Sequence, residues 1–163
     1  MACGMAAESG EPVALSCTGA TAARNYPSGL TEAFYRHLPI VAITSSQYFG
    51  KVGQMNAQFT DRNVIQRDIA KMSIQIPYPN NADDRWSNNV KINTALLELT
   101  RDGGGPVHIN IETRYSRDFS VKELPHERVI RRFLPTSHLP EITEKKVCIF
   151  VGAHKKFSER LQR

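Results

Sequence analysis

The chain has 163 residues, of which 40% are hydrophobic and 23% are charged, with a formal net charge of +5. This composition is typical of one globular domain, or of one domain plus a fragment of another. The basic residues are scattered among acidic ones without alternating aromatic side chains, so the charge indicates a solvated surface and no nucleic-acid partner. No apolar run approaches the ~20 residues of a membrane span, and residues 1–7 do not resemble a signal peptide.

The cysteines and the absence of several sequence motifs argue against disulfides and against some kinds of catalytic site. Cys3, Cys17 and Cys148 are odd in number, and at least two lie in apolar runs, which is typical of buried thiols in a reducing cytoplasm. We therefore expect a cytoplasmic protein without disulfides or a membrane partner. The sequence has no C-x-x-C, H-E-x-x-H, G-x-S-x-G or P-loop motif, which counts against metal, serine and NTPase chemistry carried by this chain.

The first 46 residues predict a helix followed by a βαβ unit. Residues 1–8 are helical in composition and Gly10 is a stop signal. Residues 12–18 and 39–44 are nearly continuous apolar runs, typical of parallel strands buried on both faces. Between them Pro27 fits the first turn of a helix, because it lacks an amide proton. The apolar stripe of that helix is Leu30, Ala33, Phe34 and His37.

The loop after the first strand is a candidate ligand site. Residues 18–22 have small side chains and follow the carboxyl end of a strand, where open α/β sheets bind their ligands. Residues 45–60 are polar, interrupted by glycine and too long for a tight turn, which is typical of functional loops. The residues alone leave the ligand open.

The second half predicts two helices, two strands and a linker. Residues 61–72 form an amphipathic pattern with Thr60 or Asp61 as N-cap, and a second stripe opens at Trp86, which we interpret as packing. His108 has no sequence-near acid or metal partner, so we interpret it as structural. The remaining predicted elements are strands over 73–76 and 106–111, a helix ending near Arg101, a proline-punctuated linker over 112–144, a buried strand over 146–154 and a helix start over 155–163.

Two separated motifs carry a family resemblance. The segment CTGATAARNYPSGLTEA, followed by LPIVAIT, and the later segment GGGPVHINI occur in this order. They resemble the pyrimidine-binding (Pyr) domain of thiamine-diphosphate enzymes, in the group of acetolactate synthase and the menaquinone-pathway SEPHCHC synthase. The resemblance covers roughly residues 1–111. It implies an α/β fold, a three-layer α/β/α arrangement with a mainly parallel, flavodoxin-like sheet that is incomplete at its N-terminus.

The resemblance also implies a domain organisation and a set of cofactor contacts. Residues 1–119 would be a Pyr domain lacking its first βα, residues 120–144 an interdomain linker, and residues 145–163 the first βα of a truncated central domain. The segment VGQMNAQF is similar to a family segment whose amide faces the cofactor, so Asn56 or Gln58 takes that role, with the register open. The implied cofactor-binding residues are Thr18, Gly19, Ala20, Thr21, Asn25, Asn56 and Gln58.

The implied function is the thiamine diphosphate-binding part of a 2-oxo acid decarboxylating carboligase. The glutamate that activates the aminopyrimidine is expected upstream of Met1, because Glu8 and Glu11 lie at the wrong end of the first helix. We therefore expect no catalytic residue here, and Mg²⁺ bound by a domain that the chain does not include. The parent enzyme, a decarboxylase or transferase, is expected to be a homodimer or homotetramer, and this chain alone to be inactive.

A second hypothesis stays open from the residues. The chain could be a non-catalytic flavodoxin-like or Rossmann-like module whose 18–22 turn receives a nucleotide phosphate at a helix N-terminus. The turn lacks G-x-G-x-x-G and an acid placed to bind a ribose, which weakens this alternative.

Overall fold

The structure is a computed structural model that describes residues 1–18, 20–62, 65–143 and 145–153. The chain divides into two compact units, Met1–Arg132 and Phe133–Arg163. Every described helix and strand falls in the first unit. Within the described ranges, no helix is long and apolar enough to cross a membrane.

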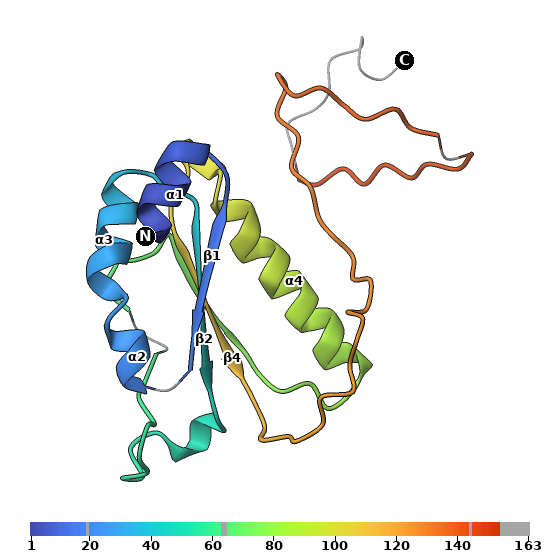
Figure 1. The fold of residues 1–163 in the computed structure, drawn as a ribbon. Coiled ribbons are helices and arrows are strands. Elements are labelled where there is room, and N and C mark those ends of the chain that lie inside the picture. The colour runs from blue at the N-terminus through green and yellow to red at the C-terminus, as the bar shows by residue number, and fades with distance from the viewer. Residues whose placement is uncertain (19, 63–64, 144, 154–163) are drawn as a thin grey trace. The chain divides into compact units, whose positions relative to one another are not determined.

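A sheet of four parallel strands forms the centre of the first unit (Figure 1). Because all pairings are parallel, the carboxyl ends of the strands share one edge. This arrangement confirms the predicted α/β fold. The strands predicted over residues 12–18, 39–44 and 106–111 lie in one sheet. In the order β1-β2-β4-β3, the strands are β1 (Val13–Cys17), β2 (Ile40–Ser46), β3 (Met72–Ile76) and β4 (Val107–Glu112).

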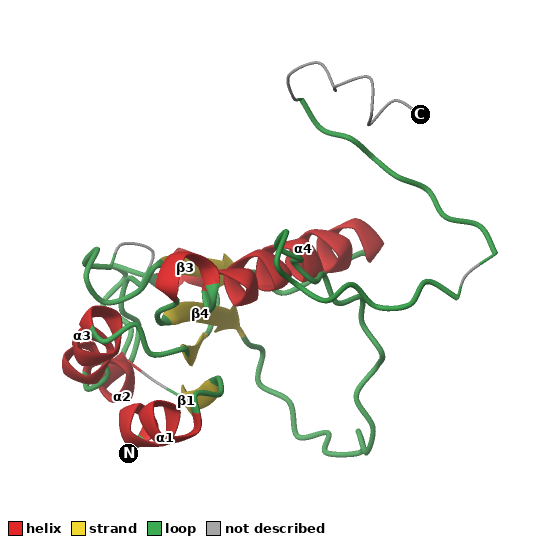
Figure 2. Cartoon of the chain, turned by 90° about the horizontal axis from the view of Figure 1, so that it is seen from above, coloured by secondary structure: helices red, strands yellow, loops and turns green. Residues whose placement is uncertain are grey.

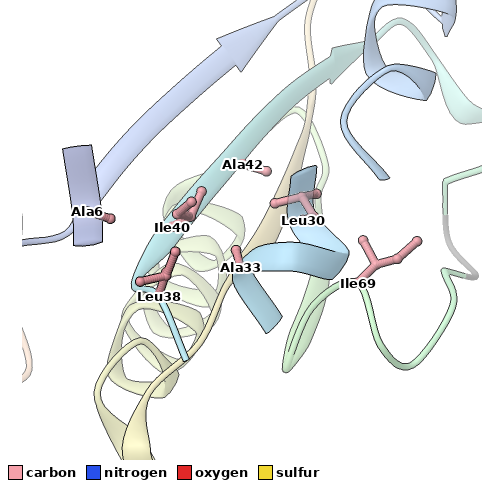
Figure 3. Packing of buried hydrophobic residues seen from close by; sticks show 7 residues of the cluster. All are labelled: Ala6, Leu30, Ala33, Leu38, Ile40, Ala42 and Ile69. Atoms are coloured by element: carbon pink, nitrogen blue, oxygen red, sulfur yellow. The ribbon is translucent and has the colours of Figure 1, made fainter. Parts of the chain in front are cut away.

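Helices cover both faces of this sheet (Figures 1 and 2). On one face, α1 (Ala2–Ser9) and α3 (Pro27–Tyr35) bury a cluster that includes Leu30 and Ile40 (Figure 3). On the other face, α4 (Ala82–Glu98) packs on a second cluster that includes Ile109. The alternation of strand side chains therefore feeds two separate cores.

The helix ends follow the predicted signals, with one difference. Gly10 closes α1 in the left-handed conformation at φ 70°, and its N–H donates to the Ala6 carbonyl. Pro27 is in the first turn of α3. His37, which the predicted stripe assigns to this helix, lies beyond its end at φ 56°, because the chain reverses there to enter β2.

The interpretation of Trp86 as a packing residue of α4 is wrong. Trp86, interpreted as packing, is 68% exposed, whereas Asn88, Ala95 and Leu99 are buried. The face that meets the sheet carries amides as well as apolar residues, so hydrophobicity alone misplaced it. Asn88 donates its amide to the Pro77 carbonyl (2.9 Å), and Asn81 caps the helix by accepting from the Asp84 N–H (2.8 Å).

The helix predicted over residues 61–72 is also wrong for the residues that the structure describes there. Residues 67–69 form a turn, the other described residues up to 71 are irregular, and β3 already begins at Met72. Arg62 is 7% exposed and reaches into the sheet, while Ile69 packs in the first core cluster. Tertiary contacts of these side chains override the local helical pattern. Asn63 and Val64 lie outside the described residues.

The chain after β4 is extended and irregular. Its backbone is held on α4 by Asn93, whose Nδ2 donates to the Arg128 carbonyl (3.0 Å) and whose Oδ1 accepts from the Ile130 N–H (2.8 Å). In the second unit, the run predicted as a buried strand after Lys146 is coil, and Phe150 is 93% exposed. A parallel strand needs a neighbour, and the described part of this unit contains none. The rest of that prediction, at residue 154, and the helix predicted over 155–163 lie outside the described residues.

Candidate functional site

A cavity of about 530 Å³ lies at the carboxyl edge of the sheet. We call it the carboxyl-edge cavity. It lies where β1, β2 and β4 end, the edge at which open α/β sheets bind ligands. Hydroxyl and amide side chains dominate its described lining, with two aromatic rings among them. The lining includes Thr18, Ser45, Ser46, Gln58, Phe59 and Tyr115.

The structure brings two of the predicted cofactor residues together and leaves others apart. Thr18 and Gln58 both line the carboxyl-edge cavity. Asn56 is exposed and its Nδ2 donates to the Gln54 carbonyl of its own loop (3.2 Å). Asn25 lines a different, smaller cavity beside α1.

Two further predicted residues, Ala20 and Thr21, belong to the start of the short helix α2 (Ala20–Arg24). The predicted loop is therefore shorter than residues 18–22, because the helix begins at Ala20. Thr21 is an exposed residue in its first turn. Gly19 lies outside the described residues.

Gln58 has a backbone that L-residues rarely adopt. Its φ is 65°, and Met55 in the same loop has a φ of 53°. Non-glycine residues in this left-handed region are uncommon and cluster at ligand sites, where surrounding structure holds them in place. The loop thus presents Gln58 to the cavity at a conformational cost.

A buried hydrogen-bond network lies under the cavity and fixes one of its walls. Asn110, 1% exposed, uses all four bonding positions of its amide. Its Nδ2 donates to Ser46 Oγ (2.9 Å) and Gln75 Oε1 (2.6 Å). Its Oδ1 accepts from Thr44 Oγ1 (2.7 Å) and Arg62 Nη1 (3.2 Å). Ser46 is the member that lines the carboxyl-edge cavity.

His108 continues the network between three strands. Its Nε2 lies 2.8 Å from Thr44 Oγ1, and its Nδ1 lies 2.8 Å from Ser73 Oγ. Because the Thr44 proton is donated to Asn110, Thr44 accepts from Nε2–H, which leaves Nδ1 to accept from Ser73. Burial, and then the nearby Arg62 charge, lower the pKa of His108 from 6.5 to about 4. The histidine is therefore neutral and hydrogen-bonded on both sides, in agreement with a structural role.

Arg62 joins the network to the end of β2. Its Nη1 donates to the Ser45 carbonyl (2.7 Å), and its own carbonyl accepts from Gln75 Nε2 (3.1 Å). Burial is the main cause that lowers the pKa of Arg62, opposed by Cys17, and Arg24 lowers it further. This buried cation therefore tethers the 60–62 segment to the residues that line the cavity.

The described lining of the carboxyl-edge cavity suits a flat polar ring and contains no acid. Ser46 Oγ accepts from Asn110, so its own proton can be donated into the cavity. Arg114 is the charged member of the described lining, and its guanidinium carbon lies 3.8 Å from the Tyr78 ring centroid. None of the described lining residues is aspartate or glutamate. Across the described ranges, no three His, Cys, Asp or Glu residues are grouped as metal ligands.

Sequence reasoning missed the network, although the sequence contains a signal for it. Polar residues recur two positions apart on three strands: Thr44 and Ser46, Ser73 and Gln75, and His108 and Asn110. Residues at spacing two share one face of a strand, so three such pairs on neighbouring strands form a polar patch. Each pair alone is unremarkable, and only the strand order β2-β4-β3 brings them together.

Comparison with known proteins gives a consistent set of relatives. No protein-family model matches the chain. It is 36% identical over 135 residues to the 2-succinyl-5-enolpyruvyl-6-hydroxy-3-cyclohexene-1-carboxylate synthase of Phocaeicola vulgatus, covering 81% of this chain and 24% of that protein. The Bacteroides thetaiotaomicron synthase of the same name is 36% identical over 133 residues, with the same coverage. That of Cytophaga hutchinsonii is 28% identical over 174 residues, covering 99% of this chain and 31% of that protein.

These relatives share one printed name, and the matches to them span most of the chain. The chain covers about a quarter of the length of the first two and less than a third of the third. It is therefore homologous over most of its length to part of bacterial 2-succinyl-5-enolpyruvyl-6-hydroxy-3-cyclohexene-1-carboxylate synthases.

Proposed function

We propose that this chain forms the aminopyrimidine side of a thiamine diphosphate site, in an enzyme that decarboxylates a 2-oxo acid and transfers the product to an acceptor. The observation that carries the proposal is the carboxyl-edge cavity. Thr18 and Gln58, assigned to the cofactor from sequence resemblance, line this same cavity although 40 residues separate them. Homology to the synthases supports the proposal.

The residues present fit an aminopyrimidine ring. Such a ring needs hydrogen-bond partners at its edge and apolar surface over its faces. Thr18, Ser46 and Gln58 supply donors and acceptors, and Phe59 and Tyr115 supply aromatic surface. Ser46 is held in place by Asn110, and Gln58 by its strained loop, so both are preorganised.

The proposed roles follow from the described lining of the cavity, which contains no acid. Thiamine diphosphate, when bound, supplies a thiazolium carbon that attacks the carbonyl of a 2-oxo acid. The residues of this chain bind and orient the ring and exclude water from it. We propose that the activating carboxylate, the Mg²⁺ and the diphosphate-binding groups come from other parts of a homodimer or homotetramer. This chain alone is then catalytically inactive.

Chemical-shift mapping of the isolated chain with thiamine tests the proposal. A small ring on half a site binds weakly, so titration into the millimolar range is needed. We expect the largest shifts at Thr18, Ser46 and Gln58. Shifts confined to residues outside the carboxyl-edge cavity, or no shifts at all, would contradict the proposal.

Three variants sharpen this test. Ser46→Ala and Gln58→Ala remove polar groups of the cavity and should each weaken thiamine binding by about fivefold, as for one lost hydrogen bond of about 1 kcal/mol. Asn56→Ala is the matched control, because this amide bonds within its own loop and does not line the cavity. Equal losses in all three variants would argue against the assignment.

A further inference from the structure

One side of α4 holds a short piece of the chain that follows β4 (Figure 1). We call residues 128–132 the strap. The strap belongs to the first unit, which ends at Arg132. It is neither helix nor strand, and two apolar residues in it, Val129 and Ile130, are 72% and 43% exposed. Apolar burial therefore contributes little to holding it.

Main-chain hydrogen bonds hold the strap instead. The Asn93 amide donates from Nδ2 to the Arg128 carbonyl (3.0 Å) and accepts at Oδ1 from the Ile130 N–H (2.8 Å). Asn89 Nδ2 donates to the same Arg128 carbonyl (3.1 Å). In an extended chain, the carbonyl of one residue and the N–H two residues later face the same side, and a parallel neighbouring strand bonds this pair of groups. The Asn93 amide thus bonds the strap as a residue of a parallel strand would.

The helix itself fixes this amide. Asn93 Nδ2 also donates to the Asn89 carbonyl, one turn earlier in α4 (2.9 Å), and Asn93 is 6% exposed. A side chain whose rotamer is already set loses little entropy when the strap docks. We call Asn89 and Asn93 the amide clamp.

A second contact lies one turn further along α4. Arg132 Nη1 donates to the Leu97 carbonyl (3.1 Å), and Arg132 Nη2 lies 3.7 Å from Glu98 Oε1. From residue 93 to residue 97 the helix advances about 6 Å, and an extended chain spans about 6.6 Å from residue 130 to residue 132. The spacing of the two contacts therefore matches an extended strap that runs in the direction of α4.

We propose that the strap is a releasable anchor, which docks on α4 through its main chain and opens as one unit while the core stays folded. Segments with few buried apolar contacts open at a lower free energy than the core. The docked strap makes Arg132 the point from which the chain enters the second unit. After opening, that point moves back towards Glu112, the end of β4. The inference does not rest on the proposed thiamine site.

Amide hydrogen exchange of the full chain tests the separate opening. Corrected for intrinsic rates, exchange should be fastest at Val121, slower by about tenfold or more at Ile130, and slowest at Ile109 in the core. The described part of the chain gives the Val121 N–H no partner, whereas Ile109 is 4% exposed in β4. An Ile130 rate equal to that of Val121 would mean that the clamp does not hold. A rate equal to that of Ile109 would mean that the strap does not open separately.

Variants of the clamp test its chemistry. Asn93→Ala removes both bonds, and Asn93→Asp removes the donor without a change in size. Each should speed exchange at Ile130 about tenfold and leave Ile109 unchanged. Thr94→Ala is the control, because the exposed Thr94 donates within α4, to the Val90 carbonyl (2.8 Å). Equal effects of Asn93→Asp and Thr94→Ala would refute the clamp.

Limited trypsin digestion separates the main chain of the strap from its side chains, with no change in α4. Ile130→Pro deletes the clamped N–H and should speed cleavage after Arg132 about tenfold relative to cleavage after Lys122, which lies outside the strap. Ile130→Ala keeps the N–H and should leave this ratio within about twofold of the wild type. Equal ratios in the two variants overturn the proposal.

Discussion

The two faces of the sheet differ in kind although the same strands build them. On the α4 face, β4 contributes Val107 and Ile109 to an apolar cluster. On the opposite face, beside the apolar cluster that contains Ile40, it contributes His108 and Asn110, which are equally buried and belong to a polar network. We call this mixed face the polar face. An apolar face tolerates substitutions of similar volume, whereas a network loses several bonds when one member changes. The polar face is therefore the one that positions a site.

The largest effect is expected from the apolar face. Ile109→Ala should lower the free energy of unfolding by about 3 kcal/mol, because Ile109 is 4% exposed and its loss leaves a cavity under α4. Urea denaturation measures this change. Leu96→Ala on the same helix–sheet layer is the control, since Leu96 is 41% exposed and should change the value far less. Similar losses in the two variants would mean that α4 does not pack as described.

The second effect is a pH dependence that belongs to the polar face. The folded chain holds His108 with a pKa of about 4 against an ordinary 6.5, so the unfolded chain binds its proton first as the pH falls. The stability from the neutral histidine is present above pH 6.5 and is lost towards pH 4. The loss is at most about 3 kcal/mol.

Denaturation of the wild type and His108→Gln across this range measures that dependence. The difference in unfolding free energy between the wild type and His108→Gln should change between pH 6.5 and pH 4. Titration of carboxylates affects both proteins and therefore cancels in this difference. The matched control is His126→Gln, which removes an exposed histidine outside the network. If the unfolding free energy of His108→Gln depended on pH in the same way as that of the wild type, the network would not hold this histidine neutral.

A third, smaller effect links the polar face to the cavity. Asn110→Ala should cost about 2 kcal/mol of unfolding free energy, because buried partners in Thr44, Gln75 and Ser46 lose a bond. It should also weaken thiamine binding, since Ser46 is then no longer held. Loss of stability without any effect on thiamine would separate the network from the site.

The smallest effect concerns the loop. Gln58→Gly should raise the unfolding free energy by about 0.5 kcal/mol, because relief of the left-handed backbone exceeds the entropy cost of glycine. Thiamine affinity should fall at the same time. Gln54→Gly, in the same loop but without a positive φ, should be slightly destabilising. A destabilising Gln58→Gly would mean that the loop is not strained.

The sequence predicts the strands and α3 well, and it predicts the polar face of the sheet poorly. Apolar runs and stop signals such as Gly10 and Pro27 act locally, so the strands and α3 follow from them. Trp86 and the 61–72 segment were misassigned because their environment depends on residues distant in the chain, such as those that surround Arg62. Of the residues assigned to the cofactor, Thr18 and Gln58 line the carboxyl-edge cavity, and their role in binding stays a prediction. Ser46 and Asn110 were missed because their pairing requires the strand order.

The affinity of thiamine compared with that of thiamine diphosphate plus Mg²⁺ tests the proposed half-site directly. The described lining of the carboxyl-edge cavity includes no metal-binding carboxylate, so the diphosphate should add nothing: calorimetry or chemical-shift titration should give affinities within about twofold of each other. A nucleoside diphosphate should bind no better than either. Micromolar affinity for thiamine diphosphate, or for the nucleotide in preference to thiamine, would contradict the account.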